Sequence, residues 1–65
     1  MIKYPEIIVQ LTGEEGNAFA ILGRVSRAMR QAGLNQAQIN EYTNEAMAGT
    51  YDDLLQATLK YVTVQ

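Results

Sequence analysis

The side chains that could perform acid–base chemistry occur as two pairs of neighbouring carboxylates, Glu14 with Glu15 and Asp52 with Asp53. Adjacent carboxylates do not converge on a helix, and neither pair has the spacing of a calcium-binding loop. Each pair lies where a helix is expected to begin, and the positive end of a helix dipole stabilises acidic side chains there. The pairs therefore predict helix starts rather than catalytic or metal-binding residues.

Nucleophilic catalysis has no base to support it. The 65 residues include no histidine and no cysteine, which removes the usual neutral-pH base, the commonest metal ligand and any disulfide. Ser26 and the four tyrosines consequently lack an activating partner. We expect a protein that is not an enzyme and that binds no cofactor, no metal and no small molecule.

One glycine-flanked segment, Gly13-Glu14-Glu15-Gly16, superficially matches the GXXG loop that clamps nucleic-acid backbones. That loop joins two helices, whereas this segment follows a strand-like run and carries two negative charges. It also lacks the lysine that a phosphate-binding P-loop places after its second glycine. We interpret the segment as the turn that starts a helix, with anion binding as the disfavoured alternative.

Arg24, Arg27 and Arg30 repeat at three-residue spacing, opposite the apolar side of an expected helix. Three guanidinium groups on one face could contact successive phosphates, which makes a nucleic-acid accessory role the alternative function. The competing interpretation is a solvated face that pairs with Glu41, Glu45 or the acidic residues of a partner. The net charge of −2 favours this second interpretation and disfavours attraction to nucleic acid or anionic membranes.

The flank of the same helix combines a large ring, Phe19, with two very small residues, Ala20 and Gly23. A glycine inside a helix costs about 1 kcal/mol relative to alanine, so Gly23 needs a reason. One interpretation is close approach by another helix or a second subunit. The other is that Phe19 folds back onto its own sheet while Gly23 admits a neighbouring side chain.

A partner interface is the favoured function. It comprises Ile8 on the outer face of the first strand together with Phe19, Ala20 and Gly23. A core this small and a two-stranded sheet are marginal alone, and exposed strand edges invite pairing. We therefore expect a non-enzymatic protein-interaction or accessory module that binds another protein or itself as a homodimer.

The elements that position these residues follow from hydrophobic periodicity. Alternation over Glu6 to Thr12 predicts a strand, and the apolar arc over Ala18 to Ala32 predicts a helix. Asn17 is a suitable N-cap for this helix, and Gly33 supplies its left-handed end. Leu22 is expected in the core.

Two further helices are indicated by capping chemistry. Asn35 and Gln38 form the pattern of a capping box before a second helix, which ends at Gly49. Thr50 caps a third helix with Asp53 at the corresponding position. Met47 is expected beside the inner stripe of the second helix. Tyr51 and Leu55 are expected on the apolar face of the third.

Residues Lys60 to Gln65 return to the alternating period of a strand. Because strands from opposite chain ends must pair, the predicted fold is α+β with the order β-α-α-α-β over a single domain, residues 1–65. Three helices are expected to cover one face of the two-stranded sheet. An antiparallel pair is favoured, since the third helix enters its strand without a reversing turn.

The run from Gly16 to Gly23, GNAFAILG, is followed by Arg27-Ala28 and by Arg30 to Gly33. With these residues, and with Gly49 to Leu55 matching a Gly-x-Tyr-Asp-x-Leu-Leu segment, nearly the whole chain resembles a group of small uncharacterised bacterial and phage proteins. The resemblance implies a shared fold only, because no activity is established for that group.

The longest apolar run, Ala18 to Leu22, is far shorter than the roughly 20 residues of a membrane span. The N-terminus also lacks the successive basic, apolar and small-residue regions of a signal peptide. We therefore expect a cytoplasmic protein without membrane contact.

Overall fold

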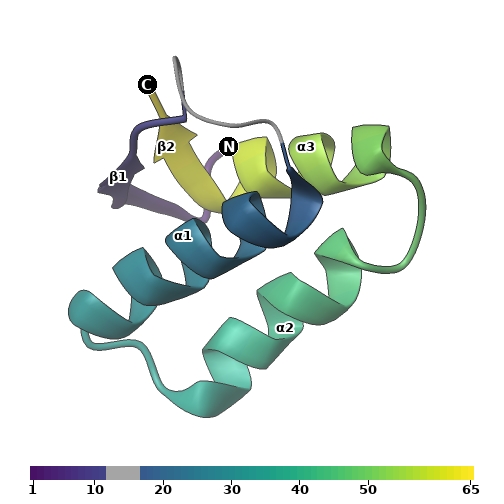
Figure 1. Ribbon diagram of the computed structural model, residues 1–65. Coiled ribbons are helices and arrows are strands. Elements are labelled where there is room, and N and C mark those ends of the chain that lie inside the picture. The colour runs from purple at the N-terminus through teal and green to yellow at the C-terminus, as the bar shows by residue number, and fades with distance from the viewer. Residues whose placement is uncertain (12–16) are drawn as a thin grey trace.

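The computed structural model describes residues 1–11 and 17–65 (Figure 1). The elements follow the order β1 (Tyr4–Val9), α1 (Ala18–Gln31), α2 (Gln36–Ala46), α3 (Tyr51–Tyr61) and β2 (Val62–Val64). The α+β class and this order agree with the prediction, although β1 begins and ends earlier than expected. Within the described residues, no helix is long and apolar enough to cross a membrane. The Gly13–Gly16 segment, with Glu14 and Glu15, lies outside the described residues.

The two strands run parallel, so the prediction of an antiparallel pair is wrong. That prediction rested on the absence of a reversing turn between the third helix and the strand that follows it. In the structure, the N–H of Val62 donates to the carbonyl of Thr58 at the end of α3. Val62 itself already has the extended torsions φ −133° and ψ 164°. One ordinary residue therefore redirects the chain from helix to strand.

The register of the sheet shifts once along β1, between Tyr4 and Ile8. Pro5 lies in this irregular stretch, and the hydroxyl of Thr63 donates to its carbonyl at 2.8 Å. Backbone pairing continues beyond both strands: Lys3 N–H donates to the Lys60 carbonyl at 3.0 Å, and Leu11 N–H to that of Gln65 at 2.9 Å. The N-terminal and C-terminal segments are thus joined along more than the length of β2.

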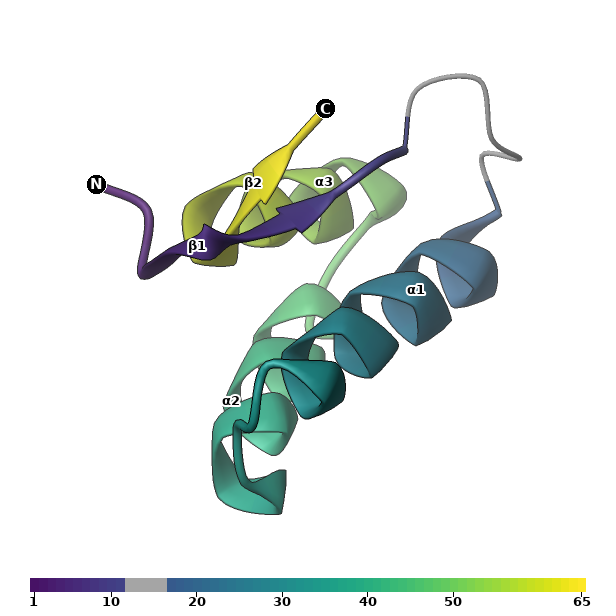
Figure 2. The same ribbon diagram turned by 90° about the vertical axis from the view of Figure 1, so that its left-hand side faces the viewer.

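α1 and α3 cover one face of the sheet rather than all three helices as predicted, and Ile7 and Val9 are buried on this face while Glu6 and Ile8 are exposed. α1 packs on β1 and α3 on β2, whereas α2 packs mainly against the other two helices (Figure 2). Leu22 is buried as predicted, but Leu55 is only half-buried at the margin of the core. The largest fully buried side chains are Tyr42, Met29, Val25, Val62 and Thr58.

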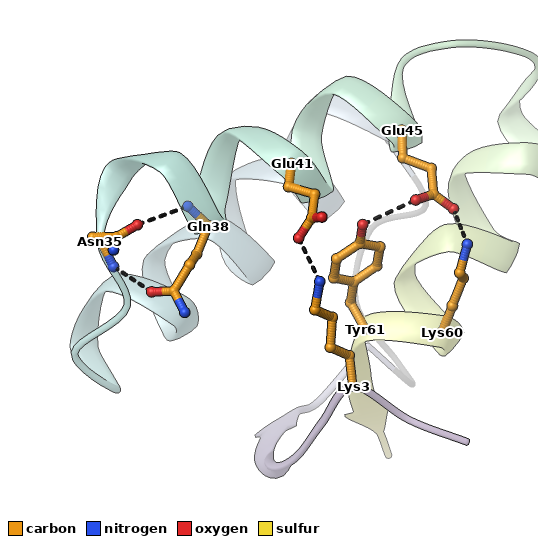
Figure 3. Close-up of polar contacts among 7 residues, drawn as sticks. All are labelled: Lys3, Asn35, Gln38, Glu41, Glu45, Lys60 and Tyr61. Carbon is orange, nitrogen blue, oxygen red and sulfur yellow. Dashed lines mark hydrogen bonds and ion pairs between the residues drawn. The ribbon is translucent and has the colours of Figure 1, made fainter.

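The helix starts have the predicted caps. The Asn17 side chain accepts hydrogen bonds from the N–H groups of Phe19 and Ala20, at 2.8 and 3.3 Å. Asn35 and Gln38 bond reciprocally at 2.8 Å in a complete capping box (Figure 3). These contacts satisfy N–H groups that the helix itself leaves without partners.

The third helix begins in the same way. Asp53 accepts from the N–H of Thr50 at 2.9 Å and donates its own N–H to the Thr50 hydroxyl at 3.3 Å. The structure thus confirms the interpretation of Asp53 as a capping residue. Gly33, after α1, has φ 95°, a conformation that favours glycine.

Candidate interaction surfaces

Large apolar side chains from three helices surround a hollow where α1 begins, α2 ends and α3 begins. Its volume of about 250 Å³ is below the usual range for small-molecule sites. Phe19, Met47 and Tyr51 at this hollow are exposed by 76%, 61% and 44%. We call it the helix-end hollow, lined chiefly by Phe19, Leu22, Ala46, Met47, Tyr51 and Leu54.

The sequence-predicted interface divides between two places. Phe19 lies at the rim of the helix-end hollow, and Ala20 and Gly23 are exposed on α1. Phe19 therefore does not fold back onto the sheet. A Cβ added at Gly23 would have no described heavy atom within 4 Å apart from its own helix backbone and chain neighbours, so no neighbouring side chain explains this glycine. Ile8 lines a different surface and does not join the other three.

A second surface lies between β1 and α1, and we call it the sheet-edge groove. All three predicted arginines are exposed, but only Arg24 and Arg27 border the groove, whereas Arg30 donates to the Gln36 side chain at 3.2 Å. The structure thus places Ile8 beside two of these arginines. The groove is lined by Ile8, Val9, Gln10, Arg24, Arg27, Ala28 and Gln31.

Ion pairs connect residues near the two chain ends to α2 (Figure 3). Lys3 binds Glu41 at 2.5 Å, and Lys60 binds Glu45 at 2.6 Å. The Tyr61 hydroxyl donates to the other oxygen of Glu45 at 2.9 Å. Glu41 and Glu45 therefore pair with lysines near the chain ends.

The electrostatics of this cluster favour a structural role. Hydrogen bonds from Lys60 and Tyr61 hold the pKa of Glu45 below its ordinary value. Burial, and then the hydrogen bond to Glu45, raises the pKa of Tyr61 to about 12. The hydrogen bond to Glu41 raises the pKa of Lys3. Each group is held in its neutral-pH protonation state.

Two carboxylates border one polar hollow beside α3, Glu45 and Asp53. Both carboxylates already accept hydrogen bonds from other residues. Asp53 accepts from the N–H of Thr50, and Glu45 accepts from the side chains of Lys60 and Tyr61. A general acid needs a raised pKa at neutral pH, and that of Glu45 is lowered. In the described part of the chain, no three acidic residues gather as a metal site would require.

Met47 and Tyr51 are the surface residues that sequence reasoning missed. Both were expected to face inward, and both are exposed at the helix-end hollow. α2 ends at Ala46 and α3 begins at Tyr51, so both side chains lie at helix ends. Hydrophobic periodicity no longer predicts which side chains are buried where a helix begins or ends. An apolar residue on each side of the Ala48-Gly49-Thr50 turn was the available signal.

Comparison with known proteins covered families, curated sequences and solved structures. No family model matches the chain, and no curated protein or solved structure matches it either. The resemblance to small bacterial and phage proteins stays a prediction.

Proposed function

We propose that this protein is a non-enzymatic protein-interaction module that binds a second copy of itself through the helix-end hollow. The observation that carries the proposal is the exposure of Phe19, Met47 and Tyr51 around one depression. Fully burying one such side chain contributes about 1.5–3 kcal/mol. Solvent exposure of all three is therefore costly unless a partner covers them.

A second copy suits this surface because each chain supplies both an exposed ring and a hollow. The Phe19 side chain is 76% exposed at the rim of the hollow, so two copies related by a two-fold axis could each insert Phe19 into the hollow of the other. The small residues Ala20 and Gly23 continue along α1 from the ring. They would let two α1 helices approach closely where the rings exchange.

Sedimentation velocity over a range of concentrations tests the proposal. We expect the native chain to reach the mass of two copies as concentration rises. Phe19→Ser is expected to weaken the dimer at least tenfold, because two buried rings are lost per dimer. Gly23→Gln is expected to weaken it as well, by placing a long side chain between the helices.

Leu59→Ser is the matched control, since Leu59 is 50% exposed but lies beside Leu55 and Val64, outside the helix-end hollow. It is expected to leave the dimer unchanged. A monomer at every concentration contradicts the proposal. Equal effects of Phe19→Ser and Leu59→Ser also contradict it, because they would mean that association is not specific to this surface.

A further inference from the structure

The α1 side of the sheet-edge groove carries basic side chains, although the chain is acidic overall. On its α1 side it is bordered by the guanidinium groups of Arg24 and Arg27, and its described lining includes no carboxylate. The chain as a whole carries a net charge of −2. The groove adjoins a strand that pairs only with β2 among the described residues.

The hydrogen-bond pattern decides which backbone groups of β1 face the groove. Gln65 N–H donates to the Val9 carbonyl, and Leu11 N–H donates to the Gln65 carbonyl, both at 2.9 Å. Along a parallel ladder, the backbone groups of alternate residues point to the same edge. Those of Ile8 and Gln10 consequently point to the edge away from β2, where a further strand can pair with them.

The two arginines are placed to recognise acidic side chains. Arg24 and Arg27 are neighbours on one face of α1, three residues apart, and both are exposed. Arg27 makes no hydrogen bond or ion pair among the described contacts. A guanidinium binds a carboxylate through two parallel hydrogen bonds, which gives directional recognition as well as attraction.

We propose that the sheet-edge groove binds an extended acidic segment of another protein as a third strand on β1. The backbone of the segment pairs with Ile8 and Gln10, while its carboxylates meet Arg24 and Arg27. A nucleic acid would use the guanidinium groups alone and leave the backbone groups of the strand edge unused. This site is separate from the helix-end hollow and does not depend on self-association.

Fluorescence anisotropy with labelled peptides tests the site. The probes are a capped peptide of alternating glutamate and threonine, the same peptide with lysine for glutamate, and an acidic version with alternate amides N-methylated. We expect the first, acidic peptide to bind and the lysine peptide not to bind. N-methylation is expected to weaken binding about tenfold through lost backbone hydrogen bonds, and Arg27→Gln by about two- to fivefold, as for an exposed ion pair.

Arg30→Gln is the matched control, because Arg30 is exposed on the same helix but bonds to Gln36 outside the groove. It is expected to leave peptide binding unchanged, as is Phe19→Ser, whose side chain lies at the other surface. Any of three results overturns the proposal: no binding of the acidic peptide, equal losses from Arg27→Gln and Arg30→Gln, or no effect of N-methylation. Tighter binding of a single-stranded oligonucleotide through Arg24 and Arg27 would overturn it in favour of nucleic acid.

Discussion

The buried hydroxyl groups of Tyr42 and Thr58 lie 2.8 Å apart between α2 and α3. The Thr58 hydroxyl donates its one proton to the Leu54 carbonyl at 2.9 Å, so Tyr42 must be the donor in the pair. Burial raises the pKa of Tyr42 and keeps the phenol protonated for that role. The two residues are therefore unequal partners, and removing one differs from removing the other.

Thr58→Val is expected to destabilise the protein by about 1–3 kcal/mol, because it leaves a buried tyrosine hydroxyl without an acceptor. Tyr42→Phe is expected to cost only about 0.5–1.5 kcal/mol, because the Thr58 hydroxyl keeps its bond to Leu54. Denaturant unfolding of both variants measures these costs. The double variant should lose less free energy of unfolding than the sum of the losses in the two single variants. A larger loss in Tyr42→Phe than in Thr58→Val would contradict the assignment of Tyr42 as the donor.

At the level of elements, the turn between α2 and α3 combines a glycine with a capping carboxylate. A Cβ at Gly49 would collide with the carboxylate of Asp53, which accepts from the Thr50 N–H. Gly49 does not have a positive φ, so its backbone would accept alanine. The glycine is needed here for the space that it leaves to Asp53.

Gly49→Ala is expected to destabilise the native protein by about 1 kcal/mol, the typical cost of losing a helix cap. In an Asp53→Gly background, which also removes the Asp53 Cβ that would lie 3.2 Å from the new methyl group, the same substitution should stabilise by about 0.4–1 kcal/mol, because alanine restricts the unfolded chain more than glycine. A thermal-unfolding cycle of the four proteins tests this reversal of sign. Destabilisation in both backgrounds would show that the clash with Asp53 is not the cause.

These elements show why part of the fold could be predicted from sequence. Caps such as Asn17 and the pair Asn35–Gln38 depend on residues within one helical turn, so their chemistry is visible locally. The direction of β2 depends instead on the torsions of Val62 and on pairing with residues at the other end of the chain. No local residue type encodes that pairing.

The surfaces were predicted only in part for a similar reason. The unusual combination of a large ring at Phe19 with a glycine at position 23 can be recognised within the sequence of one helix. Both residues are exposed, as an interface would require. The proximity of Ile8 to Arg24 depends on how α1 packs against β1, which sequence spacing does not determine.

Across the whole molecule, the cluster of Lys3, Glu41, Glu45, Lys60 and Tyr61 joins both chain ends to α2. Lys3, Glu45 and Tyr61 have shifted pKa values in the fold, so folding stability must depend on pH. The pKa of Tyr61 rises from 10.0 in the unfolded chain to about 12 in the fold. Its contribution is complete below pH 10 and is lost as the pH rises toward 12.

Stability against denaturant, measured at steps of pH, is expected to fall between pH 10 and about 12. The raised pKa of Lys3 adds a loss in the same direction, above its ordinary value of 10.5. Tyr61→Phe should flatten this decline, whereas Tyr51→Phe, which removes an exposed phenol, should not. An unchanged alkaline slope in Tyr61→Phe would assign the decline to other groups.

On the acid side, the lowered pKa of Glu45 predicts a loss of folding stability as the pH falls below its ordinary pKa of 4.5.

The parallel pairing of β1 and β2 also determines how the molecule responds to mechanical force. The N-terminus leaves one end of the sheet and the C-terminus the other (Figure 2). Tension along the chain would therefore slide the strands past each other. The force would act on all the backbone hydrogen bonds between them at once, including those of Lys3 and Gln65. An antiparallel pair would be peeled apart one bond at a time. Shear of this kind should let a very small domain resist stretching between residues 1 and 65.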